Sequence, residues 1–292
     1  MHLLETPIVR LNFIEQKFNL NNKVYAKVES FNPSGSIKAR TVLGMLEYYK
    51  NNGVLKEGST IVEATSGNTG IALSYFSKEM NYKAIIVMPN SVSIQRRQII
   101  EKYGGKVVLI TGGMKECHEK VSEILKNVDD AFEFGQFDCL ANPKTHYLTT
   151  APEIYKQCPD VNFVFAGVGT GGTISGIGKF FKVNKLDVKA IGVEPLNSNI
   201  LNGGKPGPHL IQGIGANFIP NTYLGEFVDE VVDVDDLAAI EMAKLIRSEE
   251  KIDIGISSGA ALLGAIQYIK KHNIKNKNVV IIFPDKGDRY SW

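Results

Sequence analysis

The sequence has few cysteines, almost no excess charge and no long apolar run. Its 292 residues contain three cysteines, too few for a disulfide framework, and their spacing matches no zinc site. With 33 basic and 31 acidic residues the formal charge is +2, so no basic face for nucleic acid is expected. No apolar stretch approaches the roughly 18 residues of a membrane span, and Met1–Arg10 lacks the pattern of a signal peptide. These absences predict a cytoplasmic protein without a metal, a membrane or a nucleic-acid partner.

What is present is the composition of a folded protein. Hydrophobic residues make up 43% and charged residues 22%, which is ordinary for a globular chain of one large or two medium domains. Near-continuous apolar strands alternate with helical segments, and this pattern is typical of α/β proteins with parallel sheets covered on both faces. The predicted strands are 24–28, 60–64, 83–88, 106–111, 162–166, 189–193 and 278–283. The predicted helices are 36–53, 71–80, 94–103, 114–128, 173–182, 235–251 and 260–272. The irregular stretch 197–221, rich in glycine and proline, is predicted to be a functional loop.

Polar turns follow several of these strands, where ligands bind in open α/β sheets. Residues 63–70 carry the hydroxyl or amide side chains of Thr65, Ser66, Asn68 and Thr69 at a helix start. These are more hydrogen-bonding groups than one helix cap needs, so the turn is predicted to bind an anion, with capping as the alternative.

A second turn, 167–173, is a glycine nest with two threonine hydroxyls, suited to a phosphate group. It also satisfies GxGxxG, and Glu194 follows Gly172 at the spacing of a nicotinamide dinucleotide site, so both ligands fit. In a third turn, 255–260, a serine N-cap is the favoured local explanation for one hydroxyl.

A fourth segment, 32–40, places Lys38 just inside a helix start, although a solvated helix lysine is the commoner case. Combined with Ser-Gly-Asn-Thr-Gly at 66–70 and Gly-Thr-Gly-Gly-Thr at 169–173, it resembles the cysteine synthase family. That family comprises O-acetylserine sulfhydrylases and cystathionine β-synthases, which are pyridoxal phosphate enzymes of the tryptophan synthase β fold (fold type II). The resemblance extends from Thr6-Pro7 to Arg289-Tyr290.

The resemblance implies two open, mostly parallel twisted sheets covered by helices. It implies a larger cofactor-binding domain, 1–39 plus 141–292, and a smaller mobile domain, 40–140, that closes over substrate. A homodimer is expected by the same resemblance, and the C-terminal tail of a serine acetyltransferase is a possible partner.

By resemblance, Lys38 forms the Schiff base with pyridoxal phosphate and later moves the substrate's Cα proton. Asn68 would bind the cofactor's ring oxygen and Ser257 its pyridine nitrogen. A neutral serine there leaves the nitrogen unprotonated and favours β-elimination and β-replacement over transamination. The phosphate would be held by Gly169, Thr170, Gly171, Gly172 and Thr173. The substrate would be bound by Thr65, Ser66, Gly67, Thr69, Gln136, Gly215 and Asn217.

The implied reaction is β-replacement, in which O-acetylserine loses acetate to give an aminoacrylate and sulfide or a small thiol then adds to yield cysteine. The alternative is a related transferase or a carbon–oxygen or carbon–sulfur lyase, using serine, cysteine or homocysteine, of the cystathionine β-synthase or hydrogen sulfide-producing type.

Two positions depart from the family pattern. Asn217 stands where sulfhydrylases have glycine and cystathionine β-synthases an acid, so it either handles a polar group of the substrate or supplies the same left-handed backbone. Cys139 stands where relatives usually have asparagine, and it is either near the site or a buried free thiol.

Overall fold

The structure, a computed structural model, describes residues 3–290 and divides into two compact units. The smaller unit is Lys38–Gln136, and the larger unit contains the chain up to Ile37 and from Phe137 onward. The chain therefore passes from one unit to the other at two residues that the sequence assigns to the site, Lys38 and Gln136. The larger predicted domain includes residues 1–2 and 291–292, which lie outside the described part of the chain.

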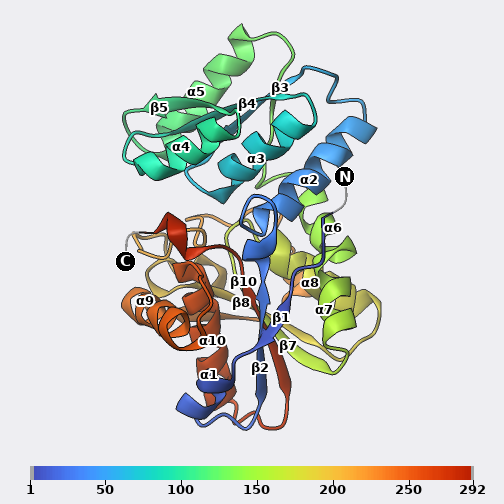
Figure 1. Cartoon of the computed structure of the whole chain (residues 1–292), viewed down its shortest axis with the longest axis vertical. Coiled ribbons are helices and arrows are strands. Elements are labelled where there is room, and N and C mark those ends of the chain that lie inside the picture. Colours follow the sequence, from blue (N-terminus) through green and yellow to red (C-terminus); the bar gives the residue numbers. More distant parts are fainter. Residues whose placement is uncertain (1–2, 291–292) are drawn as a thin grey trace. The chain divides into compact units, whose positions relative to one another are not determined.

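A six-stranded sheet forms the centre of the larger unit (Figure 1). Its spatial order is β1-β2-β10-β7-β8-β9, and every neighbouring pair is parallel except β1 with β2. The strands are β1 (Ile8–Arg10), β2 (Lys23–Val28), β7 (Val161–Gly167), β8 (Lys189–Pro195), β9 (Glu230–Val234) and β10 (Asn278–Phe283). Parallel pairing brings the carboxyl ends of β2, β10, β7, β8 and β9 to one edge, where the turns of interest begin.

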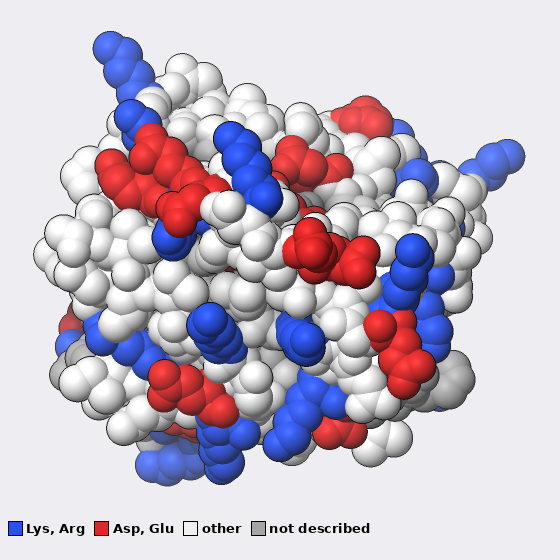
Figure 2. Space-filling view, turned by 90° about the horizontal axis from the view of Figure 1, so that it is seen from above, with Lys and Arg blue, Asp and Glu red and all other residues white. Residues whose placement is uncertain are grey.

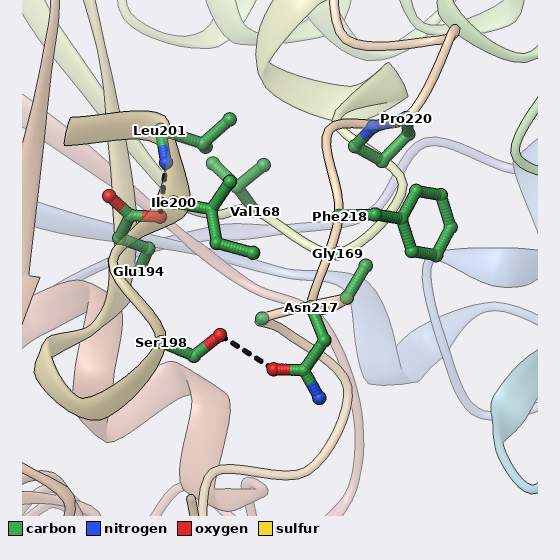
Figure 3. Close-up of a pocket in the computed structure, with 11 residues that line it drawn as sticks. Val168, Gly169, Glu194, Ser198, Ile200, Leu201, Asn217, Phe218 and Pro220 are labelled. Carbon is green, nitrogen blue, oxygen red and sulfur yellow. Dashed lines mark hydrogen bonds between the residues drawn. The ribbon is translucent and has the colours of Figure 1, made fainter. Parts of the chain in front are cut away.

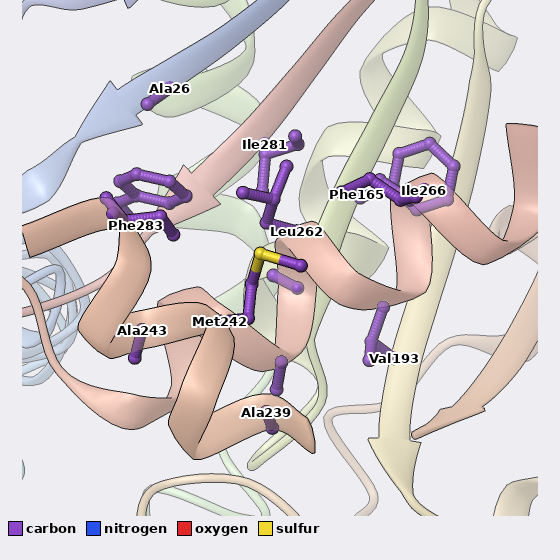
Figure 4. Close-up of a cluster of buried hydrophobic side chains, with 14 of the residues drawn as sticks. Ala26, Phe165, Val193, Ala239, Met242, Ala243, Leu262, Ile266, Ile281 and Phe283 are labelled. Carbon is purple, nitrogen blue, oxygen red and sulfur yellow. The ribbon is translucent and has the colours of Figure 1, made fainter. Parts of the chain in front are cut away.

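Both faces of this sheet are buried because successive strand residues point to opposite sides. Val279, Ile281 and Phe283 of β10 pack on one face, while Val280 and Ile282 pack on the other. The first face is covered by α9 (Asp236–Leu245), which continues as the π-helical turn η5 (Ile246–Glu250), and by α10 (Ile256–Lys271); Figure 4 shows this core. The other face is covered by α7 (Thr150–Gln157) and α8 (Gly172–Val183), and α6 (Ala141–Leu148) packs on α8. The short α1 (Asn12–Lys17) lies within the β1–β2 connection.

The smaller unit has its own four-stranded parallel sheet with the order β5-β4-β3-β6. Its strands are β3 (Thr60–Ala64), β4 (Lys83–Pro89), β5 (Lys106–Ile110) and β6 (Ala131–Glu133). Val62, Ala64 and Val87 pack with Cys117 and Val121 of α5 (Met114–Asn127) on one face. The remaining helices are α2 (Lys38–Asn51), α3 (Asn68–Glu79) and α4 (Ile94–Lys102), of which α3 contacts β4. Both sheets and their helical layers agree with the α/β class expected from the sequence.

The long stretch 197–221 is irregular, as predicted, apart from two short 3-10 turns, η2 (Leu196–Ser198) and η3 (Ile200–Asn202). On the face seen in Figure 2, basic and acidic side chains are interspersed rather than gathered by sign. Among residues 3–290, no helix is both long and apolar enough to cross a membrane.

Candidate active site

The predicted phosphate cradle lies where β7 ends and α8 begins. The residue that precedes α8 is Gly171, with a left-handed φ of 80°, and no side chain caps the helix start. Glycine is the residue that adopts this conformation without strain. Because the amides at a helix start favour an anion, this turn presents a site for a phosphate group.

Amide, hydroxyl and imidazole side chains from distant segments hold the cradle. Thr170 accepts a hydrogen bond from Asn142 Nδ2 at 3.0 Å, and its carbonyl accepts one from the Thr222 hydroxyl at 2.6 Å. The Thr173 hydroxyl lies 3.3 Å from Nε2 of the buried His146, whose Nδ1 lies 2.8 Å from the Thr150 hydroxyl. These contacts fix both threonines of the cradle without placing a carboxylate on either hydroxyl.

The cradle is also closely packed from behind. A Cβ at Gly169 would lie 2.5 Å from the carbonyl oxygen of Gly213, and one at Gly172 would collide with the side chain of Asn142. The glycines are therefore required by the close approach of neighbouring groups as well as by the ligand proposed for the turn.

A pocket lies between Gly169 of the cradle and the irregular loop (Figure 3). It is lined by three residues predicted from the sequence, Gly169, Gly215 and Asn217, and the Gly215 amide donates to the carbonyl of Val168 at 2.9 Å. Asn217 has a φ of 64°, and its Oδ1 accepts hydrogen bonds from the Ser198 hydroxyl at 2.7 Å and the Gly207 amide at 3.3 Å. Asn217 thus takes the left-handed backbone expected of a glycine replacement while its side chain ties the loop together.

Glu194, at the end of β8, lines the same pocket. Its two carboxyl oxygens accept the amides of Leu201 and Asn202, each at 3.0 Å. The pKa of Glu194 is raised to about 7, chiefly by burial and also by Asp233 on the adjacent strand, although the two amides lower it. The dinucleotide alternative assigned Glu194 to a ribose. In the structure its two carboxyl oxygens bind the amides of η3 instead.

In the smaller unit, the turn from β3 to α3 has the same plan. Gly67 precedes α3 without a side-chain cap, so the alternative that these hydroxyls serve only to cap the helix is wrong. Thr65 Oγ1 accepts the Gly67 amide at 3.2 Å, and the carbonyl of Ser66 accepts from Arg96 Nη1 at 3.0 Å. Asn68 is the first residue of α3.

A buried chain of side chains supports this turn. The Thr69 hydroxyl donates to Gln136 Oε1 at 2.6 Å, and Gln136 Nε2 donates to Glu63 Oε1 at 2.8 Å. The other carboxyl oxygen of Glu63 accepts the Gly135 amide at 3.1 Å. Burial raises the pKa of Glu63 to about 8, although these N–H donors pull it down. Near neutral pH the group behind the turn is therefore largely uncharged, which suits an anion in front of it.

The remaining predicted residues stand at helix starts. Lys38 is the first residue of α2 and is half-buried, so it is not the fully solvated helix lysine of the alternative. Ser257 is buried in the first turn of α10, whose preceding residue is Gly255, and no side chain caps this helix. The serine N-cap favoured on local grounds is thus wrong.

Sequence reasoning missed the residues that support these turns, although some signal was present. Asn142 and the segment 284–290 lie in motifs that carry the family resemblance, but no role was assigned to them. Glu63, His146 and Thr222 carried no local signal. Cys139 is half-exposed, so the expectation of a buried thiol is wrong for it. It lies two residues after Phe137, whose ring packs at a tilted angle against Phe218, with the ring centroids 5.1 Å apart.

The residues present fit a phosphorylated cofactor, because an uncapped helix start, two fixed hydroxyls and a glycine-lined approach occur in one turn. Comparison with known proteins agrees. A family model described as pyridoxal-phosphate dependent enzyme matches residues 1–285. The chain is 43% identical over 289 residues to cysteine synthase of Staphylococcus aureus, covering 98% of this chain and 92% of the relative.

Solved structures give the same result. A hydrogen sulfide-producing enzyme from Fusobacterium nucleatum aligns with a TM-score of 0.93 and 40% identity, over 98% of this chain and 95% of that one. Cysteine synthase from Entamoeba histolytica aligns with a TM-score of 0.93 and 36% identity, over 99% and 87%. The fold and cofactor expected from the sequence are confirmed, and the chain belongs to the pyridoxal-phosphate-dependent enzymes, in their cysteine synthase branch.

Proposed function

We propose that this enzyme makes cysteine by β-replacement, taking O-acetylserine as the donor and sulfide as the acceptor. The observation that carries the proposal is the 43% identity to a cysteine synthase along nearly the whole chain. O-acetylserine is small and carries a carboxylate, which suits the Thr65–Thr69 turn with its backbone amides and short hydroxyl side chains. Bound pyridoxal phosphate supplies the electron sink that stabilises the carbanion formed when the substrate loses its Cα proton.

In this proposal, Lys38 has two tasks. Its amine holds the cofactor covalently and, once the substrate's amino group has displaced it, accepts the Cα proton. An amine acts as nucleophile or base only when it is neutral, and partial burial favours the neutral form. Its place at the start of α2 adds to this, since the positive end of a helix dipole disfavours a cation.

The other predicted residues take complementary roles. The cradle of Gly169, Thr170, Gly171, Gly172 and Thr173 binds the cofactor phosphate, and Asn68 binds the ring oxygen. Ser257 faces the pyridine nitrogen, where a hydroxyl provides no carboxylate to hold a proton on the ring. The substrate carboxylate is bound by Thr65, Ser66, Gly67, Thr69 and Gln136, while Gly215 and Asn217 line the substrate pocket.

The test combines turnover with covalent mapping. The purified protein is expected to form cysteine from O-acetylserine and sulfide, and borohydride reduction followed by peptide mass mapping is expected to place the cofactor on Lys38. Lys38→Ala is expected to lose at least about 10³-fold in kcat, because it removes both the tether and the base. Normal turnover by Lys38→Ala would falsify the assignment.

A second candidate reaction is hydrogen sulfide production from cysteine, which the Fusobacterium relative favours by its name. Sulfide release from cysteine alone, measured beside cysteine formation under the same conditions, distinguishes the two. The proposal requires cysteine formation to have the higher kcat/KM.

We further propose that the enzyme is a cytoplasmic homodimer whose 40–140 domain is the mobile part during turnover.

A serine acetyltransferase C-terminal tail is the proposed protein partner, since the Thr65–Thr69 turn would accept a peptide carboxylate as readily as a substrate carboxylate. Titration of a tail peptide against substrate, with competition expected, tests this partner.

A further inference from the structure

The last described segment of the larger unit, residues 284–290, follows β10 at the carboxyl edge of the sheet. It contains the 3-10 turn η6 (Gly287–Arg289) and contacts two other segments that begin at the same edge. One is the connection from β2 to Lys38, and the other leads into α10 and Ser257. Neither contact is needed to complete the sheet or either helix.

Backbone and side-chain bonds join residues 284–290 to the connection before Lys38. The Ile37 amide donates to the Pro284 carbonyl at 2.8 Å, and Ser36 forms a β-bridge with Asp285. The Arg289 guanidinium, with only 5% of its side chain exposed, donates from Nη2 to the carbonyl of Ser34.

Gly35 shows how closely the two segments approach. It has a φ of 72°, and a Cβ at this position would lie 2.5 Å from Arg289 Nη2. The guanidinium therefore occupies the space that any other residue would fill with a side chain. The last residue before Lys38 is consequently held by the backbone of Pro284, and the turn preceding it by a charged donor.

Residues 284–290 also hold the segment that leads into α10. The Gly255 amide donates to the Asp285 carbonyl at 3.1 Å, and a Cβ at Gly255 would collide with the carboxylate of Asp285 and the ring of Tyr290. The Tyr290 hydroxyl donates to Asp285 Oδ2 at 2.6 Å, which fixes the carboxylate. Asp285 is therefore the residue that contacts both the connection before Lys38 and the segment before Ser257, and it is 1% exposed.

We propose that Arg289, Asp285 and Tyr290 are positioning residues that fix the segments leading to Lys38 and to Ser257. The inference rests on the proposed function, in which Lys38 and Ser257 bind opposite ends of the cofactor's reactive system. A displacement of about 1 Å of a reacting group costs up to about 100-fold in rate, so holding the two segments against one rigid strip of chain benefits the chemistry directly. The charge-assisted bond from Arg289 and the part-buried bond from Tyr290 are side-chain contacts that supply this rigidity.

The test uses the holoenzyme with Arg289→Ala, Arg289→Lys and Tyr290→Phe. Tyr290→Phe removes one oxygen and keeps the ring's packing, so it remains informative should Arg289→Ala fail to fold. Hydrogen exchange is followed in peptides covering 30–37 and 253–257, together with the visible circular dichroism per bound cofactor, which reports the cofactor's orientation. Lys244→Ala, which breaks an exposed ion pair on α9, is the control.

We expect Arg289→Ala to speed exchange in 30–37 by about tenfold, and Tyr290→Phe to do so mainly in 253–257. Both should alter the visible circular dichroism and lower kcat more than they raise KM, with partial recovery in Arg289→Lys. Lys244→Ala should change none of these. Wild-type exchange and dichroism in both Tyr290→Phe and Arg289→Ala would overturn the inference while leaving Lys38 as the tether. Absence of any cofactor on Lys38 in the parent protein would instead overturn the proposed function.

Discussion

Two turns in this molecule share one plan but rest on different supports. Thr65–Thr69 in the smaller unit and Gly169–Thr173 in the larger unit both follow a parallel strand and begin a helix that no side chain caps. Behind the first stands a chain from Thr69 through Gln136 to the buried carboxyl of Glu63. The second is held by amide, hydroxyl and imidazole groups and is packed tightly from behind.

The difference teaches how an anion site is matched to its ligand. The cradle proposed for the cofactor keeps one ligand through many turnovers, and close-packed contacts without a carboxylate suit that. The turn proposed for the substrate exchanges its ligand in every cycle and is supported by a titratable group. Its binding is therefore expected to depend on pH through Glu63.

The largest effect expected from this comparison is steric. Gly169→Ala places a methyl group against the backbone oxygen of Gly213, which cannot move without shifting the irregular loop. We expect a loss of about 3 kcal/mol in the free energy of unfolding, measured by urea denaturation. Gly67→Ala is the matched control, because a Cβ there has no neighbour within 4 Å and φ is −121°. Its effect on stability should stay within about 0.5 kcal/mol. Equal losses in the two variants would show that the packing difference has no energetic meaning.

The next effect concerns Glu63 and pH. Its pKa rises from 4.5 to about 8 on folding, so the native protein binds an additional proton between these values. The free energy of unfolding should therefore fall as pH rises from about 5 to 8, by at most about 1.4 kcal/mol per pH unit from this group. Urea midpoints measured across that range should decline less steeply in Glu63→Gln than in the parent. The exposed Glu79→Gln serves as control, and a slope in Glu63→Gln equal to that of the parent would contradict the assignment.

A smaller effect separates the two ligands. Asn142→Ala removes a donor to the cradle, and Thr69→Val removes the hydroxyl that reaches Gln136. Losing one buried hydrogen bond corresponds to about tenfold in affinity. We expect Asn142→Ala to weaken cofactor binding about tenfold with an unchanged substrate KM. We expect Thr69→Val to raise the substrate KM about tenfold with unchanged cofactor binding. Fluorescence titration and initial rates measure the two quantities, and parallel changes in both variants would argue against separate sites.

Much of the fold was predictable because its signals are local. β3 and β10 occur at the predicted bounds, since each has β-branched apolar residues at its centre and is flanked by polar residues. Strands β1, β6 and β9 were missed, and β1 and β6 have only three residues each, too few to establish a period. α6 and α7 were also missed, and both contain proline near the first turn, where it is compatible with a helix but reads as a break.

The ligand turns were also predictable from local signals, whereas the side chains that support these turns from behind were not. Hydroxyls and glycines that touch a ligand lie within a few residues of one another. Glu63 and Gln136 are 73 positions apart, and their contact exists only once β3 and β6 have paired. Lys27 is a further example: it is fully buried in β2, with Thr6, Glu153 and Gln157 as partners, and nothing in its neighbourhood in the sequence indicates this.

The smallest expected effect concerns Asn217, which lines the same pocket as Gly169. Its Oδ1 is committed to Ser198 and Gly207, so a role in substrate binding falls to its Nδ2. Asn217→Asp keeps an oxygen for both donors and replaces the N–H donor by an acceptor. We expect it to raise the KM for O-acetylserine about threefold to tenfold while stability changes by less than about 0.5 kcal/mol. Asn217→Gly preserves the left-handed backbone and loses both loop bonds, so it should lower stability by about 1 kcal/mol as well. A wild-type KM in both variants would show that Asn217 only holds the irregular loop together. The residues around the cradle on this side would then be purely structural, unlike those of the Thr65–Thr69 turn.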